Sequence, residues 1–192
     1  EPNIFSLELL HAFNEAAGVA GKKEYPIHLK LDTGMHRVGF MEGEIDVLLE
    51  ELAHCTHLRV ASIFSHLAGA DEEALDAFTL SQLERFERMS SRILAALPYR
   101  PMRHILNSAG QERFPHWQYD MVRLGIGLHG ISCCGNRELQ PVASLKTFIA
   151  QIKELEVGET VGYGCHGKVP QRKRIATIPI GYADGYNRHL GN

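Results

Sequence analysis

The stretch HLKLDTGMHRVGF, residues 28–40, shows how this chain of 192 residues is organised. It continues a short apolar run, Ile27 to Leu31, which predicts a buried strand. The run contains Lys30 and stops abruptly at Asp32, and Arg37 follows seven residues after the lysine. Burying a cation is costly unless it is paired. Two cations at the end of a buried strand therefore indicate a functional strand end.

Helical and strand patterns alternate along the first two thirds of the chain. Apolar residues at helical spacing predict three helices, at residues 5–17, 45–52 and 75–97. Apolar runs predict four strands, at residues 27–31, 58–64, 103–107 and 121–131. This alternation predicts an α/β fold with parallel strands and crossover helices, and the strands lack polar alternation, as expected when both faces of a sheet are buried. Four strands do not close an eight-stranded barrel, so the pattern predicts half a barrel or an open sheet.

The pattern changes near residue 135. Residues 143–164 alternate apolar and polar side chains, and residues 173–186 look like another strand followed by a loop. Such alternation is typical of antiparallel β structure. We therefore divide the chain into two domains, residues 1–136 and residues 137–192.

Composition argues against several classes of function. The 20 Lys and Arg residues and 23 Asp and Glu residues leave a net charge of -3 without a basic stripe, which argues against nucleic-acid binding. No apolar run approaches the length that spans a bilayer. The four cysteines form no C-x-x-C pair, and the 11 histidines show no zinc-ligand spacing. We expect a protein of the reducing cytoplasm and, because it begins with glutamate, a piece of a longer chain.

Polar side chains follow each predicted strand at the point where it ends. In chain order they are Lys30, Asp32, Thr33 and Arg37; Ser65, His66 and Asp71; His104, Asn107 and Ser108; and Arg123, Gly125 and Gly127. The loops after parallel strands form the active face of such folds. Four polar strand ends in succession therefore predict one shared site.

Each of these residues also has an ordinary structural explanation. The alternatives are a Lys30 that reaches out to solvent or pairs with Asp32, a satisfied core histidine at His66, a turn and helix N-cap at Asn107 and Ser108, bulge glycines at Gly125 and Gly127, and a surface tyrosine at Tyr182. Spacing alone leaves these alternatives open.

A functional interpretation joins the same residues. The Ser108 hydroxyl and the backbone N–H groups of Gly125 and Ile126 are donors of the kind that bind phosphate. Arg123 can place a fixed positive charge beside a cofactor atom. Two histidines can orient such a cofactor through hydrogen bonds: His66 and His104.

Five motifs in order resemble those of the bacterial alanine racemase family, which uses pyridoxal 5'-phosphate. They are KLDTGMHRVGF, SHLAGAD, HILNSAG, DMVRLGIGLHGI and IPIGYADGYNR, and the resemblance runs from about Pro26 to the end. It implies a homodimer in which each subunit has a parallel (β/α)8 barrel and a C-terminal β domain. Residues 1–136 would then be the second half of the barrel, and residues 137–192 the beginning of the β domain.

The resemblance also implies how the cofactor is held. Arg123 corresponds to the arginine that contacts the pyridine nitrogen, and because arginine does not readily give up its proton, that nitrogen stays unprotonated. His104 resembles the residue that supports this arginine. The positions near the phosphate are Asn107, Ser108, Gly125 and Ile126.

Proton transfer to and from alanine involves a second set of residues in this family. Tyr182 matches the catalytic tyrosine, which acts across the dimer interface, and His66 matches the residue between that tyrosine and the ring. Arg37 matches the arginine that helps to hold the substrate carboxylate. Lys30 matches a lysine that many members carry in carbamylated form, and such an anion would pair with Arg37. The implied role is supply of D-alanine for peptidoglycan.

The chain departs from the family at one essential point. The family's Schiff-base lysine lies on the first barrel strand, and no lysine here occupies its motif, so we expect the isolated chain to be inactive. His129 also stands where many members have tyrosine. The alternatives are a natural truncated relative that binds a ligand or partner without catalysis, and a racemase of another amino acid such as serine. Decarboxylases of the same barrel class fit GYADGY poorly, and the β segment after Gly135 disfavours a lone cofactor-carrying barrel.

Overall fold

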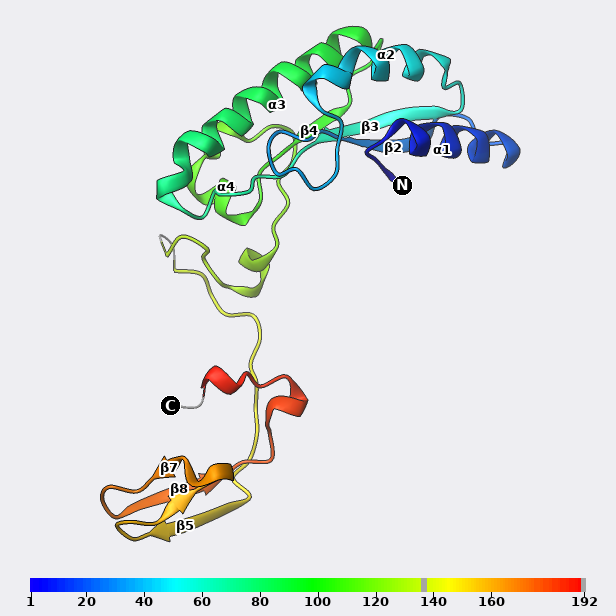
Figure 1. Ribbon diagram of the computed structural model, residues 1–192. Helices are drawn as coiled ribbons and strands as arrows, with labels where there is room; N and C mark the ends of the chain where they lie inside the picture. The colour runs from blue at the N-terminus through cyan, green and yellow to red at the C-terminus, as the bar shows by residue number, and fades with distance from the viewer. Residues whose placement is uncertain (136–137, 191–192) are drawn as a thin grey trace. The chain divides into compact units, whose positions relative to one another are not determined.

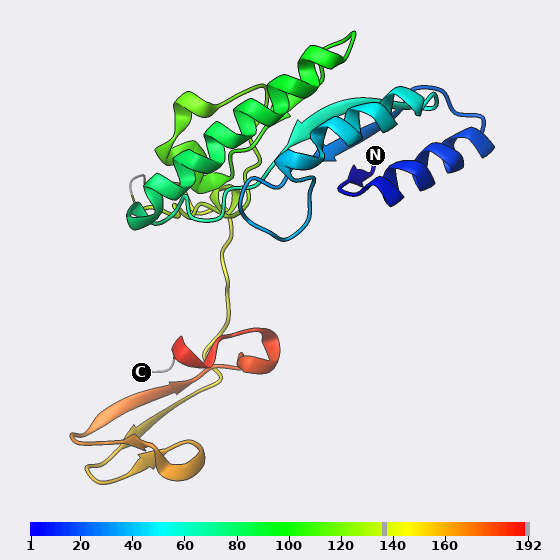
Figure 2. The same ribbon diagram turned by 45° about the horizontal axis from the view of Figure 1, so that its top comes forward.

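The computed structural model describes residues 1–135 and 138–190, in two compact units. The first unit runs from Glu1 to Val142, and the second from Ala143 to Asn192. Figures 1 and 2 show the helices and strands of each unit, which are described separately below.

The first unit is built on a parallel sheet with the strand order β1-β2-β3-β4. Its strands are β1 (Asn3–Ile4), β2 (Tyr25–Lys30), β3 (Leu58–Phe64) and β4 (Met102–His104). The helices between them are α1 (Leu7–Val19), α2 (Ile45–His54) and α3 (Asp76–Ala96), followed by the short α4 (Ser108–Arg113). Figure 2 shows these helices beside the strands, with α1 in contact with α2 and α2 with α3. Single-turn 3-10 helices complete the unit: η1 (Glu42–Glu44), η2 (Glu73–Leu75), η3 (Pro115–Trp117) and η4 (Ile126–His129).

The core of the first unit explains why these elements form. Ile27 and Leu29 alternate along β2 and are fully buried, and Ile63 on β3 is buried beside them. Phe86 and Met89 cover this core from α3 and are also fully buried. Each such side chain contributes about 1.5–3 kcal/mol of transfer free energy when it leaves water. The alternating strand-and-helix order was predicted from the sequence and is confirmed.

The predicted strand at residues 121–131 is wrong. This segment forms irregular chain and the 3-10 helix η4. The sheet still has four strands, because β1, which was not predicted, pairs with β2 at its edge. Glycines weaken a strand, and here the Ser108 hydroxyl takes the N–H groups of Gly125 (3.0 Å) and Gly127 (3.2 Å) that a strand would need for its ladder.

The second unit contains antiparallel strands, as the alternating pattern predicted. β5 (Gln151–Leu155) pairs with β8 (Lys173–Thr177), and β6 (Thr160–Val161) pairs with β7 (Gly167–Lys168). Three further 3-10 helices lie in this unit: η5 (Tyr163–Cys165), η6 (Tyr182–Asp184) and η7 (Arg188–Leu190).

Two kinds of feature are absent from residues 1–135 and 138–190. No helix there combines the length and the apolar character needed to cross a membrane. No three His, Cys, Asp or Glu side chains in that part of the chain are grouped so that they could hold a metal ion.

The loop after β2 closes on itself through its own backbone. Leu31 and Phe40 form a parallel bridge, with the Asp32 N–H donating to the Phe40 carbonyl (2.9 Å). The Asp32 carboxylate accepts from the N–H of Gly34 (2.9 Å). Gly39 has φ +139°, and a Cβ placed on it would lie 2.6 Å from the Asp32 nitrogen. Only glycine fits there, because both the dihedral angle and the neighbouring backbone exclude a side chain.

We predict that Gly39→Ala lowers the free energy of unfolding by about 3 kcal/mol, from backbone strain and the clash with Asp32. Urea unfolding followed by circular dichroism measures this change. Gly43→Ala, in η1, is the matched control, because its added Cβ meets nothing within 4 Å; its effect should stay within about 0.5 kcal/mol. Equal urea concentrations at the midpoint of unfolding for the two variants would contradict the packing described for Gly39.

Candidate active site

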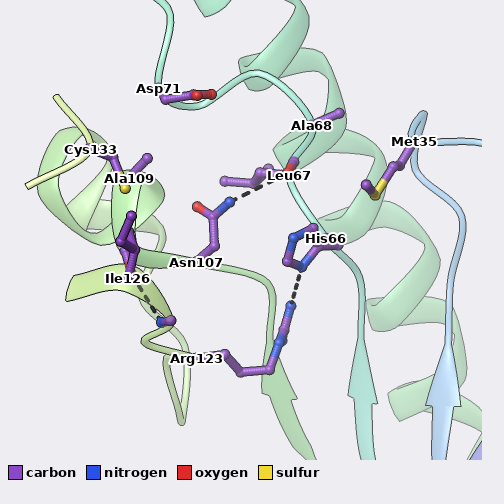
Figure 3. A pocket seen from close by; sticks show the side chains of 12 residues that line it. Met35, His66, Leu67, Ala68, Asp71, Asn107, Ala109, Arg123, Ile126 and Cys133 are labelled. Atoms are coloured by element: carbon purple, nitrogen blue, oxygen red, sulfur yellow. Dashed lines mark hydrogen bonds between the residues drawn. The ribbon is translucent and has the colours of Figure 1, made fainter. Parts of the chain in front are cut away.

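A cavity of about 360 Å³ lies where β3 and β4 end in the first unit. Figure 3 shows side chains from the loops after these strands pointing into it. Seven residues predicted from the sequence line this cavity: His66, Asp71, Asn107, Ser108, Arg123, Gly125 and Ile126. The structure therefore brings these residues together at one cavity. Sequence reasoning did not name the other lining residues, which are Met35, Leu67, Ala68, Ala109 and Cys133.

The Arg123 guanidinium is the central group of this site. It donates to three main-chain carbonyl oxygens, those of Ser65, His104 (3.3 Å) and Ile105 (3.4 Å). Its carbon Cζ lies 5.2 Å from the centroid of the Phe64 ring, a distance at which a cation attracts an aromatic face. Burial lowers the pKa of Arg123, but arginine starts from so high a value that it keeps its charge. The carbonyls at the ends of β3 and β4 thus fix a cation at the cavity wall.

Two histidines accept hydrogen bonds from this guanidinium. Arg123 donates to Nδ1 of His104 and, at 3.3 Å, to Nδ1 of His66, and Figure 3 shows His66 and Arg123 pointing toward one another. Arginine carries no acceptor, so both Nδ1 atoms must be unprotonated. Burial, followed by the charge of Arg123, lowers the pKa of His104 to about 4. Burial and the charges of Arg123, Lys30 and Arg37 also lower the pKa of His66. Both rings are therefore neutral near pH 7.

Ser108 and Asn107 shape the other end of the cavity. The Asn107 side chain caps α4 by accepting from the Gly110 N–H (2.9 Å), as the ordinary structural explanation for this pair predicted. The Ser108 Oγ acts only as acceptor in its hydrogen bonds with the described residues, those from Gly125 and Gly127. Its own hydrogen is therefore available to a ligand in the cavity.

Lys30 and Arg37 lie beside the cavity rather than on its wall. The Lys30 Nζ is 5.6 Å from the centroid of Phe64, so this ring has a second cation over it. Burial, then the charges of Arg37 and Arg123, lower the pKa of Lys30. Within the described residues the Asp32 carboxylate binds backbone N–H groups of its own loop and not Lys30. The alternative of a Lys30–Asp32 ion pair is therefore wrong.

A buried glutamine on α3, which sequence reasoning missed, ties the loops together. Gln82 accepts from the Ala68 N–H (3.0 Å) and donates to the His66 carbonyl (3.2 Å) and to the Thr33 hydroxyl (3.4 Å). Thr33 in turn bonds Ser65 (2.8 Å). The loops that carry Arg37 and His66 are thereby fixed to one helix. The available signal was a glutamine among apolar positions of a buried helix face.

Tyr182 lies in the second unit and is 65% exposed. It begins η6, and the Asp184 carboxylate caps this turn by accepting from the Gly181 N–H (2.9 Å). Gly185, at φ +89°, ends the turn. The site residues that the structure brings together are thus those of the first unit.

Comparisons with known proteins agree with the motifs. Residues 1–133 match the family model "Alanine racemase, N-terminal domain", and residues 142–192 match "Alanine racemase, C-terminal domain". An alanine racemase of Symbiobacterium thermophilum is 40% identical over 193 residues, covering 98% of this chain and 51% of the relative.

Solved structures give the same result. Alanine racemase from Streptomyces coelicolor superposes with a TM-score of 0.85 at 30% identity, covering 97% of this chain and 51% of that one. Alanine racemase from Bartonella henselae, solved with covalently bound pyridoxal phosphate, gives 0.79 at 27% identity, covering 98% and 51%. The chain spans about half the length of the relatives it matches. Both domain models and these relatives show that the chain belongs to the alanine racemase family.

Proposed function

We propose that this chain forms the cofactor-binding face of a pyridoxal-phosphate-dependent racemase that interconverts L- and D-alanine in the cytoplasm and supplies D-alanine for peptidoglycan. Residues 1–136 are then the second half of a (β/α)8 barrel, and residues 137–192 the beginning of its β domain. The observation that carries the proposal is the cavity in which a fixed guanidinium, Arg123, shares a wall with the Ser108 hydroxyl. The Bartonella henselae relative solved with covalently bound pyridoxal phosphate supports the cofactor.

The residues at the cavity suit a phosphorylated pyridine. The Ser108 hydrogen is available to a phosphate oxygen, and the Ile126 N–H opens the 3-10 helix η4, where it has no partner within the helix. Gly125 has a different role from the one predicted, because its N–H is already donated to Ser108 (3.0 Å) and holds that hydroxyl in place. The three cations near the cavity favour an anionic ligand: Lys30, Arg37 and Arg123.

When it is bound, pyridoxal phosphate supplies an electron-withdrawing ring that acidifies the α-hydrogen of an amino acid. Arg123 would hydrogen-bond the ring nitrogen without giving up its proton, which would moderate that withdrawal. His104 supports the guanidinium from behind. His66, neutral and half-buried, lines the cavity beside the guanidinium, where it can accept or pass a proton.

Racemisation needs a base on each face of the substrate. We assign Tyr182 to one face, acting on the cavity of the other subunit in a homodimer, and Arg37 to the substrate carboxylate. His66 and the cations of that cavity would assist Tyr182 in taking up and releasing its proton. Within residues 1–135 and 138–190 no lysine lines the cavity, so this chain lacks the second base.

A second candidate function is that the chain binds the cofactor or a partner without catalysis. A racemase acting on serine would share the same cofactor contacts. An assay of D-alanine formation tests catalysis, and a titration with the cofactor tests binding.

We predict that the isolated chain, given pyridoxal phosphate and L-alanine, forms no more D-alanine than pyridoxal phosphate alone. Oxidation of D-alanine by a stereospecific oxidase, coupled to peroxide detection, measures this. A full-length alanine racemase, such as the Symbiobacterium thermophilum relative, is the positive control. Turnover by the chain close to that of the control would show that it contains both bases.

Ser108→Ala should weaken binding of pyridoxal phosphate by about 10- to 100-fold, the value of one hydrogen bond to a charged group. Binding of pyridoxal, which lacks the phosphate, should not change. Absorbance titration of both ligands measures the two affinities, and Ser81→Ala, an exposed serine on α3, is the control. Equal losses for both ligands would place the phosphate elsewhere.

Lys30 should carry a carbamate in bicarbonate buffer. Its lowered pKa leaves more of the amine unprotonated; that amine adds to carbon dioxide, releases a proton and gains a negative charge, which suits the neighbouring Arg37 and Arg123. Carbon-13 NMR with labelled bicarbonate should show one carbamate signal that Lys30→Ala removes. Lys153→Ala, an exposed lysine on β5 in the second unit, should leave the signal unchanged. A signal that survives Lys30→Ala would reject this assignment.

A further inference from the structure

A row of hydrogen-bonded polar side chains crosses the parallel sheet behind Arg123. His104 on β4 bonds the Ser62 hydroxyl on β3 through Nε2 (3.0 Å), and Ser62 bonds Nδ1 of His28 on β2 (2.7 Å). His28 then bonds the Glu1 carboxylate through Nε2 (2.8 Å). Ser62 and His28 are register partners on adjacent strands, and Ser62 is fully buried. The row thus links the cavity to a carboxylate beyond the first strand.

The protons along this row can be placed by hydrogen-bond chemistry. Arg123 has donors only, so Nδ1 of His104 accepts and its hydrogen sits on Nε2. That N–H donates to the Ser62 oxygen, which leaves the serine hydrogen for Nδ1 of His28. Nε2 of His28 then donates to the Glu1 carboxylate, which in its ionised form can only accept hydrogen bonds. Every donor in the row has one acceptor, and the direction is the same throughout.

If any one of these hydrogen bonds ran in the opposite direction, two N–H or O–H donors would face each other. If Nδ1 of His104 carried the hydrogen, it would face the Arg123 N–H groups, and its bare Nε2 would need the Ser62 hydrogen. His28 prevents this, because its Nδ1 takes that hydrogen at 2.7 Å. A neutral histidine takes the tautomer that its hydrogen-bond partners select.

We infer that Ser62 and His28 are positioning residues: they lock His104 as the Nε2–H tautomer and thereby hold the Arg123 guanidinium at the cavity. Neither residue lines the cavity or ends a strand, and neither was found from the sequence. That this positions Arg123 toward a pyridine nitrogen rests on the proposed function; the tautomer lock itself rests only on the hydrogen bonds.

Nitrogen-15 NMR of the cofactor-free chain, labelled at histidine, tests the lock. Long-range correlations distinguish a protonated from an unprotonated ring nitrogen, and loss of one signal set in His104→Gln assigns His104. In the unsubstituted chain His104 should carry hydrogen on Nε2 alone. His28→Leu removes the acceptor at similar bulk, so the Ser62 hydrogen can turn to His104, whose signals should move toward the Nδ1–H tautomer. Ser62→Ala should also move them.

His28→Asn is the matched control. Its side-chain oxygen can take the place of Nδ1 as acceptor, so His104 should keep the tautomer of the unsubstituted chain. A purely structural role for His28 predicts instead that His28→Asn and His28→Leu alter stability without changing the tautomer. Titration with pyridoxal phosphate should show about a tenfold weaker affinity in His28→Leu than in His28→Asn.

The outcomes separate the inference from the proposed function. Hydrogen on Nδ1 of His104 in the unsubstituted chain overturns the inference even if no variant folds. An Nε2–H tautomer that persists in both His28→Leu and Ser62→Ala also overturns it, although cofactor binding can stand. A tautomer that switches in a chain with no affinity for pyridoxal phosphate supports the lock and counts against the proposed cofactor.

Discussion

The site depends on one half-buried cation, Arg123, whose guanidinium has hydrogen-bond donors only. Its N–H groups need acceptors when they are withdrawn from water, and they find them in carbonyls at and just after the ends of β3 and β4. The same requirement makes His66 and His104 neutral, with their acceptor nitrogens turned toward the arginine. The segment that carries Arg123 is held beside β4, because the Arg123 N–H donates to the Leu106 carbonyl (3.0 Å).

Periodicity was enough to predict most of the first unit. β3 was predicted with its observed bounds because seven consecutive residues are largely apolar, and α3 because its buried side chains recur at helical spacing. β1 was missed because a two-residue strand has no pattern, and it forms only where β2 supplies its partner. The segment at 121–131 misled because it is apolar, although its glycines and the hydroxyl of Ser108 decide its conformation.

The candidate site divides in the same way. Residues at strand ends, such as His66 and Ser108, could be predicted because parallel strands bring their ends together. The residues that support them could not be, because Gln82 and Ser62 lie inside a helix and a strand and not at strand ends. Their partners lie 14 or more residues away in sequence. For Tyr182 and Arg37 the assigned roles came from the family motifs, and spacing alone carries no such information.

Gln82 has a consequence for how this family of sequences can vary. One side chain spans the loop after β2 and the loop after β3, and it reaches them from the interior of a 21-residue helix. A residue inserted into either loop would move that loop's hydrogen-bonding groups away from the Gln82 amide, so the lengths of the two loops are expected to change together. Diversity in this part of the protein should therefore concentrate in the outward-facing positions of α3, while the two loops and the inner face of the helix change as one inherited block.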